Sequence, residues 1–259
     1  MADNSALRNP AHRKLAERYQ QFKKGQTYRF DKMKNYIILL LALTASSCDF
    51  KSAKDYFNEA EKLEEQGKYS DAIPLLDKVI EKQPDYLGAI INRGADKAAL
   101  KQYAEAIKDY ELVLSIDEKN TLAIFNIGNN KKRLSDYSSA VHYYTEALNS
   151  KGGQYLTLDW VDNPNFRNDK ADFDVKTFEI VYERGLAFYE LDSLDQASND
   201  LSNCIKNNHN TVDATFFLSQ TYFKANHIAD GCEYLKKAIQ LGYKDTLPGQ
   251  FKLCVTKSP

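Results

Sequence analysis

The sequence has little of what disulfide-rich, membrane-spanning or metal-binding proteins need. Its four cysteines are too few and too unevenly spaced for a disulfide-dense miniprotein or a zinc site of paired CxxC motifs. The apolar run at residues 36–43 is about half as long as a membrane-spanning helix. With 259 residues, 43% of them hydrophobic and 27% charged, the chain has the composition of one large or two ordinary globular domains.

The chain also lacks an excess of positive charge outside its N-terminal segment. Residues 1–47 contain nine Lys and Arg against three Asp and Glu, whereas the remaining residues contain 26 against 33. A body with this excess of carboxylates has no general attraction to phosphate backbones, so we do not expect a nucleic-acid partner.

Motifs of the common enzyme classes are missing. The sequence contains no GxSxG, Walker loop, HExxH or glycine-rich dinucleotide turn. None of the four histidines shares a local motif with a cysteine or a carboxylate pair at metal-ligand spacing: His12, His142, His209 and His227. We therefore expect no catalytic residue, metal, cofactor or small-molecule substrate.

Residues 33–48 have the order of a secretory signal. A basic start at Met33-Lys34 precedes the short apolar run, and small residues then lead to Cys48. This segment resembles a bacterial lipoprotein signal of the Bacteroidetes type, which tolerates serine where Ser47 stands. The resemblance implies cleavage before Cys48, lipidation of that cysteine and anchoring to the inner or outer membrane of a bacterial cell envelope. The alternative is a buried apolar helix with an incidental cysteine.

Residues 1–32 form a polar, basic lead that signal peptides rarely carry. We expect Met33 to be the biological start and residues 1–32 to be a mis-assigned or disordered extension. The alternative is a genuine basic tail that holds the apolar run as an uncleaved anchor.

A period of 34 residues runs through the rest of the chain. The residue types that recur are shown by four sets: Ala60, Gly94 and Gly128; Tyr69, Tyr103 and Tyr137; Ala72, Ala106 and Ala140; Leu76, Tyr110 and Tyr144. In each unit an alanine follows the small residue by twelve positions, and a large apolar or aromatic residue follows four later, which stacks side chains on helix faces. Turn-forming residues such as Gly67 separate the two helical runs. Each unit is therefore predicted to be a helical hairpin.

This pattern resembles the tetratricopeptide repeat. Units at 53–86, 87–120 and 121–154 carry most of its signature, and units at 178–211 and 212–245 carry it more weakly, with Gly231 where the family usually has alanine. Single repeats cannot bury their apolar faces, so such hairpins stack. The resemblance implies an all-α fold: a right-handed α-solenoid of about five hairpins with a C-terminal capping segment.

Three shorter segments complete the predicted organisation: a tether at 48–52, an insertion at 155–177, and a C-terminal cap and tail at 246–259. The insertion contains Trp160 and Phe166, which either pack onto the array or contact a partner. Its aspartates lack the DxDxDG spacing of a calcium loop.

The resemblance also implies a binding site, because in this family the first helices line a concave groove that accepts peptides or helices. The corresponding positions here are Phe57, Asn58, Asn92, Phe125, Asn126, Asn129, Arg133, Tyr182, Tyr189, Phe216 and Gln220. The recurring asparagines at 58, 92 and 126 could donate to and accept from the backbone of an extended peptide. The alternative is that asparagine, the family's commonest residue at this place, is kept there for hydrogen bonds between helices.

Together these features predict a non-catalytic scaffold that binds a protein or peptide partner and is held at a membrane by its lipid anchor. A soluble cytosolic adaptor and an accessory subunit of an envelope enzyme or secretion complex are the alternatives.

Cys232 and Cys254 lie eleven residues on either side of Tyr243. A helix over about 229–241, followed by a capping helix over 246–254, would bring the two sulfurs to the open end of an antiparallel hairpin. A disulfide there would persist in an oxidising envelope. The alternative is that both cysteines are small buried apolar residues. Cys204 occupies a helix-packing position and is expected to stay free.

Overall fold

The structure is a computed structural model that describes residues 50–150, 177–244 and 254. The chain divides into two compact units, residues 1–51 and 52–259, and all the described helices belong to the second. Cys48, the predicted signal at 33–47, the lead at 1–32 and residues 155–176 of the insertion lie outside the described residues. So does most of the predicted cap and tail.

The described ranges 50–150 and 177–244 form helices joined by short turns, and they contain no strand. The first six helices are α2 (Ala53–Glu64), α3 (Tyr69–Lys82), α4 (Leu87–Ala99), α5 (Tyr103–Ile116), α6 (Thr121–Arg133) and α7 (Tyr137–Asn149). The last four are α8 (Thr177–Glu190), α9 (Leu194–Lys206), α10 (Thr211–Lys224) and α11 (Ile228–Gln240). None of these helices has the length and apolar character needed to cross a membrane.

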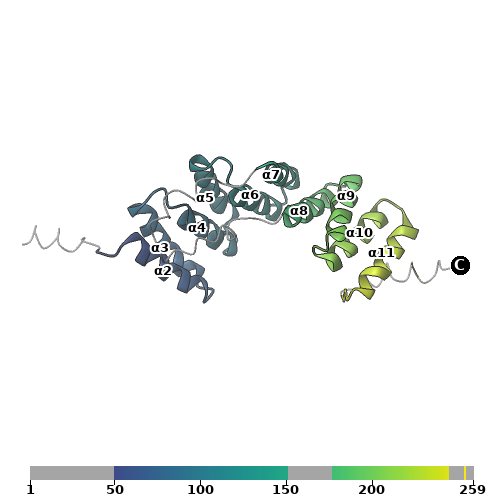
Figure 1. Cartoon of the computed structure of the whole chain (residues 1–259), viewed down its shortest axis with the longest axis horizontal. Coiled ribbons are helices and arrows are strands. Elements are labelled where there is room, and N and C mark those ends of the chain that lie inside the picture. The colour runs from purple at the N-terminus through teal and green to yellow at the C-terminus, as the bar shows by residue number, and fades with distance from the viewer. Residues whose placement is uncertain (1–49, 151–176, 245–253, 255–259) are drawn as a thin grey trace, which may run out of the picture. The chain divides into compact units, whose positions relative to one another are not determined.

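Consecutive helices pair into five antiparallel hairpins, and each hairpin packs on the next (Figure 1). The pairs are α2–α3, α4–α5, α6–α7, α8–α9 and α10–α11. α8 packs directly against α7, so the stacking continues past the insertion. The predicted all-α solenoid of five hairpins is thereby confirmed.

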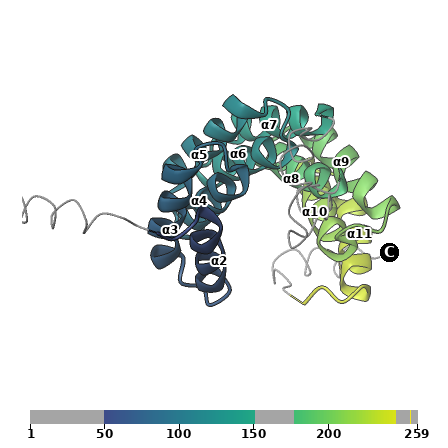
Figure 2. The same ribbon diagram turned by 60° about the vertical axis from the view of Figure 1, so that its left-hand side comes forward.

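The first helix of every hairpin lies on the same side of the array. Figure 2 shows α2, α4, α6, α8 and α10 along the inner side of the curve that the helices follow, and α3, α5, α7, α9 and α11 along its outer side. Side chains on the exposed side of the first helices therefore share one surface, which we call the inner face.

One residue in each hairpin turn has a positive φ, which lets the chain reverse while the last helix carbonyls keep their hydrogen bonds. The five residues are Gly67 (71°), Lys101 (62°), Ser135 (60°), Asp192 (56°) and Asn226 (63°). In the first turn, for example, the amide of Gly67 donates to the carbonyl of Glu64 and that of Lys68 to Leu63. The backbone conformation repeats although the residue type does not.

Small residues bring the two helices of a hairpin together. A Cβ placed on Gly94 would lie 2.9 Å from the ring of Tyr110, and one on Gly128 would lie 2.8 Å from the ring of Tyr144. Both tyrosines are at most 2% exposed, so these rings have no room to withdraw. The recurring small residues of the first helices are thus the places where the recurring aromatic rings of the second helices pack.

Candidate protein-binding face

The predicted groove residues lie on the first helices, but they differ in how much surface they offer. Five of the eleven are buried: Phe57, Phe125, Tyr182, Phe216 and Gln220. Asn92, Asn126, Asn129 and Tyr189 are half-buried, and Asn58 and Arg133 are exposed. The inner face is therefore more polar than the sequence predicts.

The buried aromatic side chains pack within the array itself. The ring of Phe57 lies 4.9 Å from that of Tyr86, and the ring of Phe125 lies 5.7 Å from that of Tyr144. A helical period identifies the side of a helix on which a residue lies, but it does not show whether a neighbouring hairpin covers it. These rings stabilise the stack and leave little area for a partner.

Polar groups on α2 and α6 remain available. The side chains of Asn58, Asn126 and Arg133 form no hydrogen bond or ion pair with any other described residue. The Asn129 Oδ1 accepts a hydrogen bond of 2.8 Å from the Tyr144 hydroxyl, which fixes the orientation of that amide. This part of the inner face therefore presents amide and guanidinium groups that the fold does not use.

Asn92 is already engaged. Its Nδ2 donates to Glu64 Oε2 at 3.1 Å, so this amide joins α4 to α2. Of the two roles that the sequence left open for the recurring asparagines, Asn92 has the hydrogen bond between helices.

The inner face at α8 and α10 is aromatic and more enclosed. The Tyr189 and Phe217 rings meet edge to face with centroids 6.0 Å apart, and Lys224 Nζ lies 4.5 Å above the Tyr189 ring. The same ammonium donates to the Tyr189 carbonyl and forms a 2.6 Å ion pair with Asp192. Burial raises the pKa of Tyr189, and the nearby Lys224 opposes that shift.

The last hairpin is closed by a disulfide. Cys232 of α11 is bonded to Cys254, with the two Cα atoms 5.3 Å apart. Cys254 packs with Phe216, and the Phe216 ring stacks on Tyr243 at a centroid distance of 3.9 Å. Phe216 is therefore covered by residues that follow α11.

Cys204 is the free cysteine among the described residues, and it is fully buried. Burial, followed by the nearby Asp200, raises the pKa of its thiol to about 12. A thiol that stays protonated at neutral pH is a poor nucleophile, so Cys204 acts as a packing residue.

Comparison with known proteins identifies the repeat. Residues 97–120, from the end of α4 through α5, match the family model described as tetratricopeptide repeat. Residues 97–120 thus match a tetratricopeptide repeat, and the other hairpins share its helical-hairpin fold. No curated protein matches the chain by sequence.

Solved structures share the fold at low identity. MamA residues 41 to the end from Desulfovibrio magneticus RS-1 has a TM-score of 0.60 at 15% identity, covering 73% of this chain and 94% of that one. YrrB, described as a tetratricopeptide-repeat protein with an unusual peptide-binding site, has a TM-score of 0.57 at 19% identity, covering 83% and 95%. A tetratricopeptide-repeat protein from Parabacteroides merdae ATCC 43184 has a TM-score of 0.60 at 16% identity, covering 79% and 71%.

Two of the repeats each contain a buried ion pair that the sequence analysis did not predict. In the second, Arg93 Nη2 lies 2.6 Å from Asp109 Oδ1; in the fourth, Arg184 Nε lies 2.8 Å from Asp200 Oδ2. Both aspartates are about 4% exposed. The signal was an arginine followed by an aspartate sixteen residues later in each of these repeats. These pairs join the two helices of a hairpin.

The described residues show no arrangement for metal chemistry, since no three His, Cys, Asp or Glu side chains in those ranges are placed to hold an ion. Among the described carboxyl groups, the one with the most shifted pKa belongs to Asp96 on α4, which is 3% exposed. Burial and the neighbouring Glu64 raise the pKa of Asp96 to about 7.

Proposed function

We propose that this protein is a non-catalytic scaffold whose inner face binds a segment of a protein partner, and that a lipid on Cys48 holds it at a bacterial envelope membrane. The observation that carries the proposal is the set of unengaged polar side chains on the inner face: Asn58 on α2 and Asn126 and Arg133 on α6. Such groups satisfy the backbone amides and carbonyls of a peptide laid across the first helices.

The structural neighbour YrrB has a peptide-binding site, which supports this use of a shared fold. With five aromatic or amide positions buried in the array, the remaining contacts are mainly polar, and we expect micromolar or weaker affinity. A dissociation constant of 1 μM corresponds to about 8 kcal/mol.

Two observations support the envelope location. The residues before Cys48 have the order of a lipoprotein signal, and the Cys232–Cys254 disulfide is a bond that persists in oxidising compartments. A diacylglyceryl group with a further acyl chain anchors stably, whereas one chain binds a membrane only marginally.

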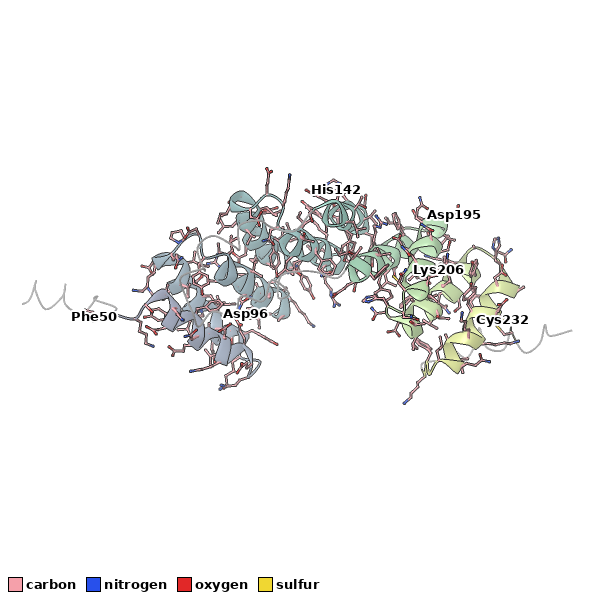
Figure 3. All side chains as sticks on the ribbon, in the orientation of Figure 1. Phe50, Asp96, His142, Asp195, Lys206 and Cys232 are labelled. Carbon is pink, nitrogen blue, oxygen red and sulfur yellow. A yellow bond between two sulfur atoms is a disulfide. The ribbon has the colours of Figure 1, made fainter. Side chains whose placement is uncertain are left out.

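Site-specific photocrosslinking in the native host tests the binding face. A photoreactive residue placed at Asn58 or Asn126 should capture a partner. One placed at His142, whose side chain on the second helix α7 is 74% exposed (Figure 3), should not. Capture from His142 and from neither inner position would contradict the assignment of the face.

Mass spectrometry of the membrane fraction tests the anchor. The mature chain should begin at a lipidated Cys48, and Cys48→Ala should move the protein to the soluble fraction. Globomycin, which blocks the lipoprotein signal peptidase, should retain the precursor. A soluble native protein without lipid would favour the cytosolic adaptor instead.

A further inference from the structure

Two carboxylates meet on the inner side of the array without a positive charge between them. Asp96 of α4, labelled in Figure 3, and Glu64 at the end of α2 interact electrostatically, and the hydrogen bond from Asn92 to Glu64 joins the same two helices. Asp96 Oδ2 and Glu64 Oε1 are both buried and have no hydrogen-bond partner. Within the described ranges, the third such side-chain atom is the His209 Nε2, far along the chain at the start of the α10 hairpin.

The nearby basic side chains are committed elsewhere. Arg93 binds Asp77 and Asp109, both at 2.6 Å, and Lys97 binds Asp109 at 2.7 Å. Asp109 therefore holds the two cations of α4 between the helices of the second hairpin. The Glu64–Asp96 pair is left with an amide, Asn92, as its one hydrogen-bond donor in the described structure.

The C-terminal ends of α2 and α4 add to the negative potential around Glu64 and Asp96. Glu61 and Glu64 lie in the last turn of α2, and Asp96 lies near the end of α4, where the helix dipole disfavours an anion. Burial raises the pKa of Glu61 and of Glu64, and further carboxylates add to each shift. A buried carboxylate without a partner is costly, so the site is suited to an incoming donor.

The pair can be approached from the inner face. Glu64 is half-buried and the neighbouring Glu61 is exposed, so the pair borders solvent on the side of Glu64. Along α4, Ala99 lies one turn after Asp96 and is exposed, and its small side chain leaves room for an aliphatic stem to lie against it. Asn92 donates to Glu64 Oε2, and Oε1 of the same carboxylate has no hydrogen-bond partner, so an incoming donor can bind Oε1 without breaking the existing bond.

We propose that Glu64 and Asp96 form a pocket for a lysine or arginine side chain of the protein segment that binds the inner face. An ammonium or guanidinium group supplies several N–H donors to two oxygens that have none, and its charge matches the unneutralised pair. This inference rests on the proposed function of the inner face, and it adds the chemistry of one contact: the partner carries a basic residue there.

Binding of a cation should depend on pH. Asp96 is partly protonated near neutral pH, and a bound cation favours its ionised form, so affinity should rise as the pH rises from 6 to 8. The titratable and charged groups around the pair are Glu61 on α2 and Glu65 just after it, Asp77 on α3, Tyr86 before α4, Arg93 and Lys97 on α4, and Asp109 and Tyr110 on α5. Burial raises the pKa of Tyr86 and of Tyr110, and despite burial the hydrogen bonds to Asp109 and Asp77 raise that of Arg93, so these three groups keep their protonation state over this pH range.

NMR of the full chain labelled with ¹⁵N tests the pocket with defined probes. The probes are acetyl-Gly-Gly-Lys-Gly-Gly-amide and the same peptide with arginine or norleucine at the centre. The lysine and arginine peptides should shift the backbone amide signals of Glu64 and Asp96 in a saturable way, and the norleucine peptide should not. Equal shifts with lysine and norleucine would overturn the proposal.

Charge-neutral variants sharpen the test. Glu64→Gln with Asp96→Asn should weaken the lysine peptide about tenfold or more, since a hydrogen bond to a charged group is worth that much. The variant should also lose the rise in affinity between pH 6 and 8. Glu190→Gln, which removes one exposed carboxylate from the far end of α8, is the matched control and should change affinity less than twofold.

The outcome separates this inference from the proposed function. A partner that crosslinks to the residue at Asn126 equally well in the native chain and in the Glu64→Gln, Asp96→Asn variant would overturn the pocket and leave the binding face intact. Loss of crosslinks from the inner face, with the lysine peptide still bound, would overturn the face and leave the pocket.

Discussion

At the N-terminal end of the array, α2 and α4 leave two buried carboxylate oxygens without a hydrogen-bond partner. At the C-terminal end, α10 and α11 are closed by the Cys232–Cys254 disulfide and by the stack of Phe216 on Tyr243. Both ends use the same helical hairpin. The difference is that residues after α11 cover the inner face of α10, whereas Glu61 and Asn58 of α2 remain exposed. We therefore expect the first three hairpins, rather than the whole curve, to receive a partner.

The largest loss of stability is expected from a substitution at Gly94, where the two helices of the second hairpin are in close contact. Gly94→Leu would force a side chain into the ring of Tyr110, which is 2% exposed, and should lower the free energy of unfolding by about 3 kcal/mol. Urea unfolding of the purified chain measures the change.

Ala95→Leu is the matched control for this substitution, because it adds the same side chain one residue later at an exposed position. It should alter stability by no more than about 0.5 kcal/mol. Equal effects of the two substitutions would show that the small position is not the contact between the helices.

Closure of the C-terminal end should contribute nearly as much. Cys232→Ser with Cys254→Ser removes a bond that spans 22 positions of the chain and should lower stability by about 2–3 kcal/mol, because the unfolded chain regains loop entropy. Thermal unfolding with and without reductant measures this contribution. The reductant should destabilise the native chain and leave the double variant unchanged; an equal response would contradict a stabilising disulfide.

The sequence predicted the features that depend on period and on local chemistry. The spacing of Gly94 and Gly128, each paired with a tyrosine sixteen positions later, was enough for the hairpins and the stacked fold. The placement of Cys232 and Cys254 about Tyr243 indicated the pair that the structure joins.

Contacts between neighbouring hairpins were beyond the sequence pattern, because they depend on the angle at which one hairpin stacks on the next. That angle buries Phe57, places Asn92 against Glu64 and brings Asp96 to the same carboxylate. Phe216 is covered instead by Tyr243 and Cys254, which follow α11. The turn conformation was hidden for another reason. Lys101 and Asp192 also adopt a positive φ, although the sequence marks neither position as a turn former, as it does Gly67 and Ser135.

Removing the unpaired charge should stabilise the N-terminal end. The folded state raises the pKa of Asp96 from 3.8 to about 7, so the folded protein binds this proton more tightly than the unfolded chain does. The free energy of unfolding therefore falls as the pH rises from about 4 to about 7. Asp96→Asn avoids this loss and should raise the free energy of unfolding by about 1–2 kcal/mol at pH 8, with solvent screening taken into account.

At pH 3, where Asp96 is protonated in both states, the Asn variant and the native chain should be equally stable. Urea midpoints from pH 3 to 8 therefore give two curves that separate as the pH rises. Curves that stay parallel would show that ionisation of Asp96 does not lower the stability of the N-terminal end.

The smallest effect concerns how the N-terminal end begins. Ser52 caps α2 through a capping box: its hydroxyl accepts from the Asp55 amide at 3.1 Å, and Asp55 Oδ2 accepts from the Ser52 amide at 3.0 Å. These bonds satisfy amides that the first turn leaves free, but they are exposed and local. Ser52→Ala should therefore cost about 0.5–1 kcal/mol and raise hydrogen exchange in the first turn of α2, while α10 and α11 keep their protection. Ser52→Asp restores an acceptor at the cap and should recover most of the loss. If Ser52→Ala instead increased exchange in α11, the two ends would unfold as one cooperative unit, and the contrast between them would not extend to their local stability.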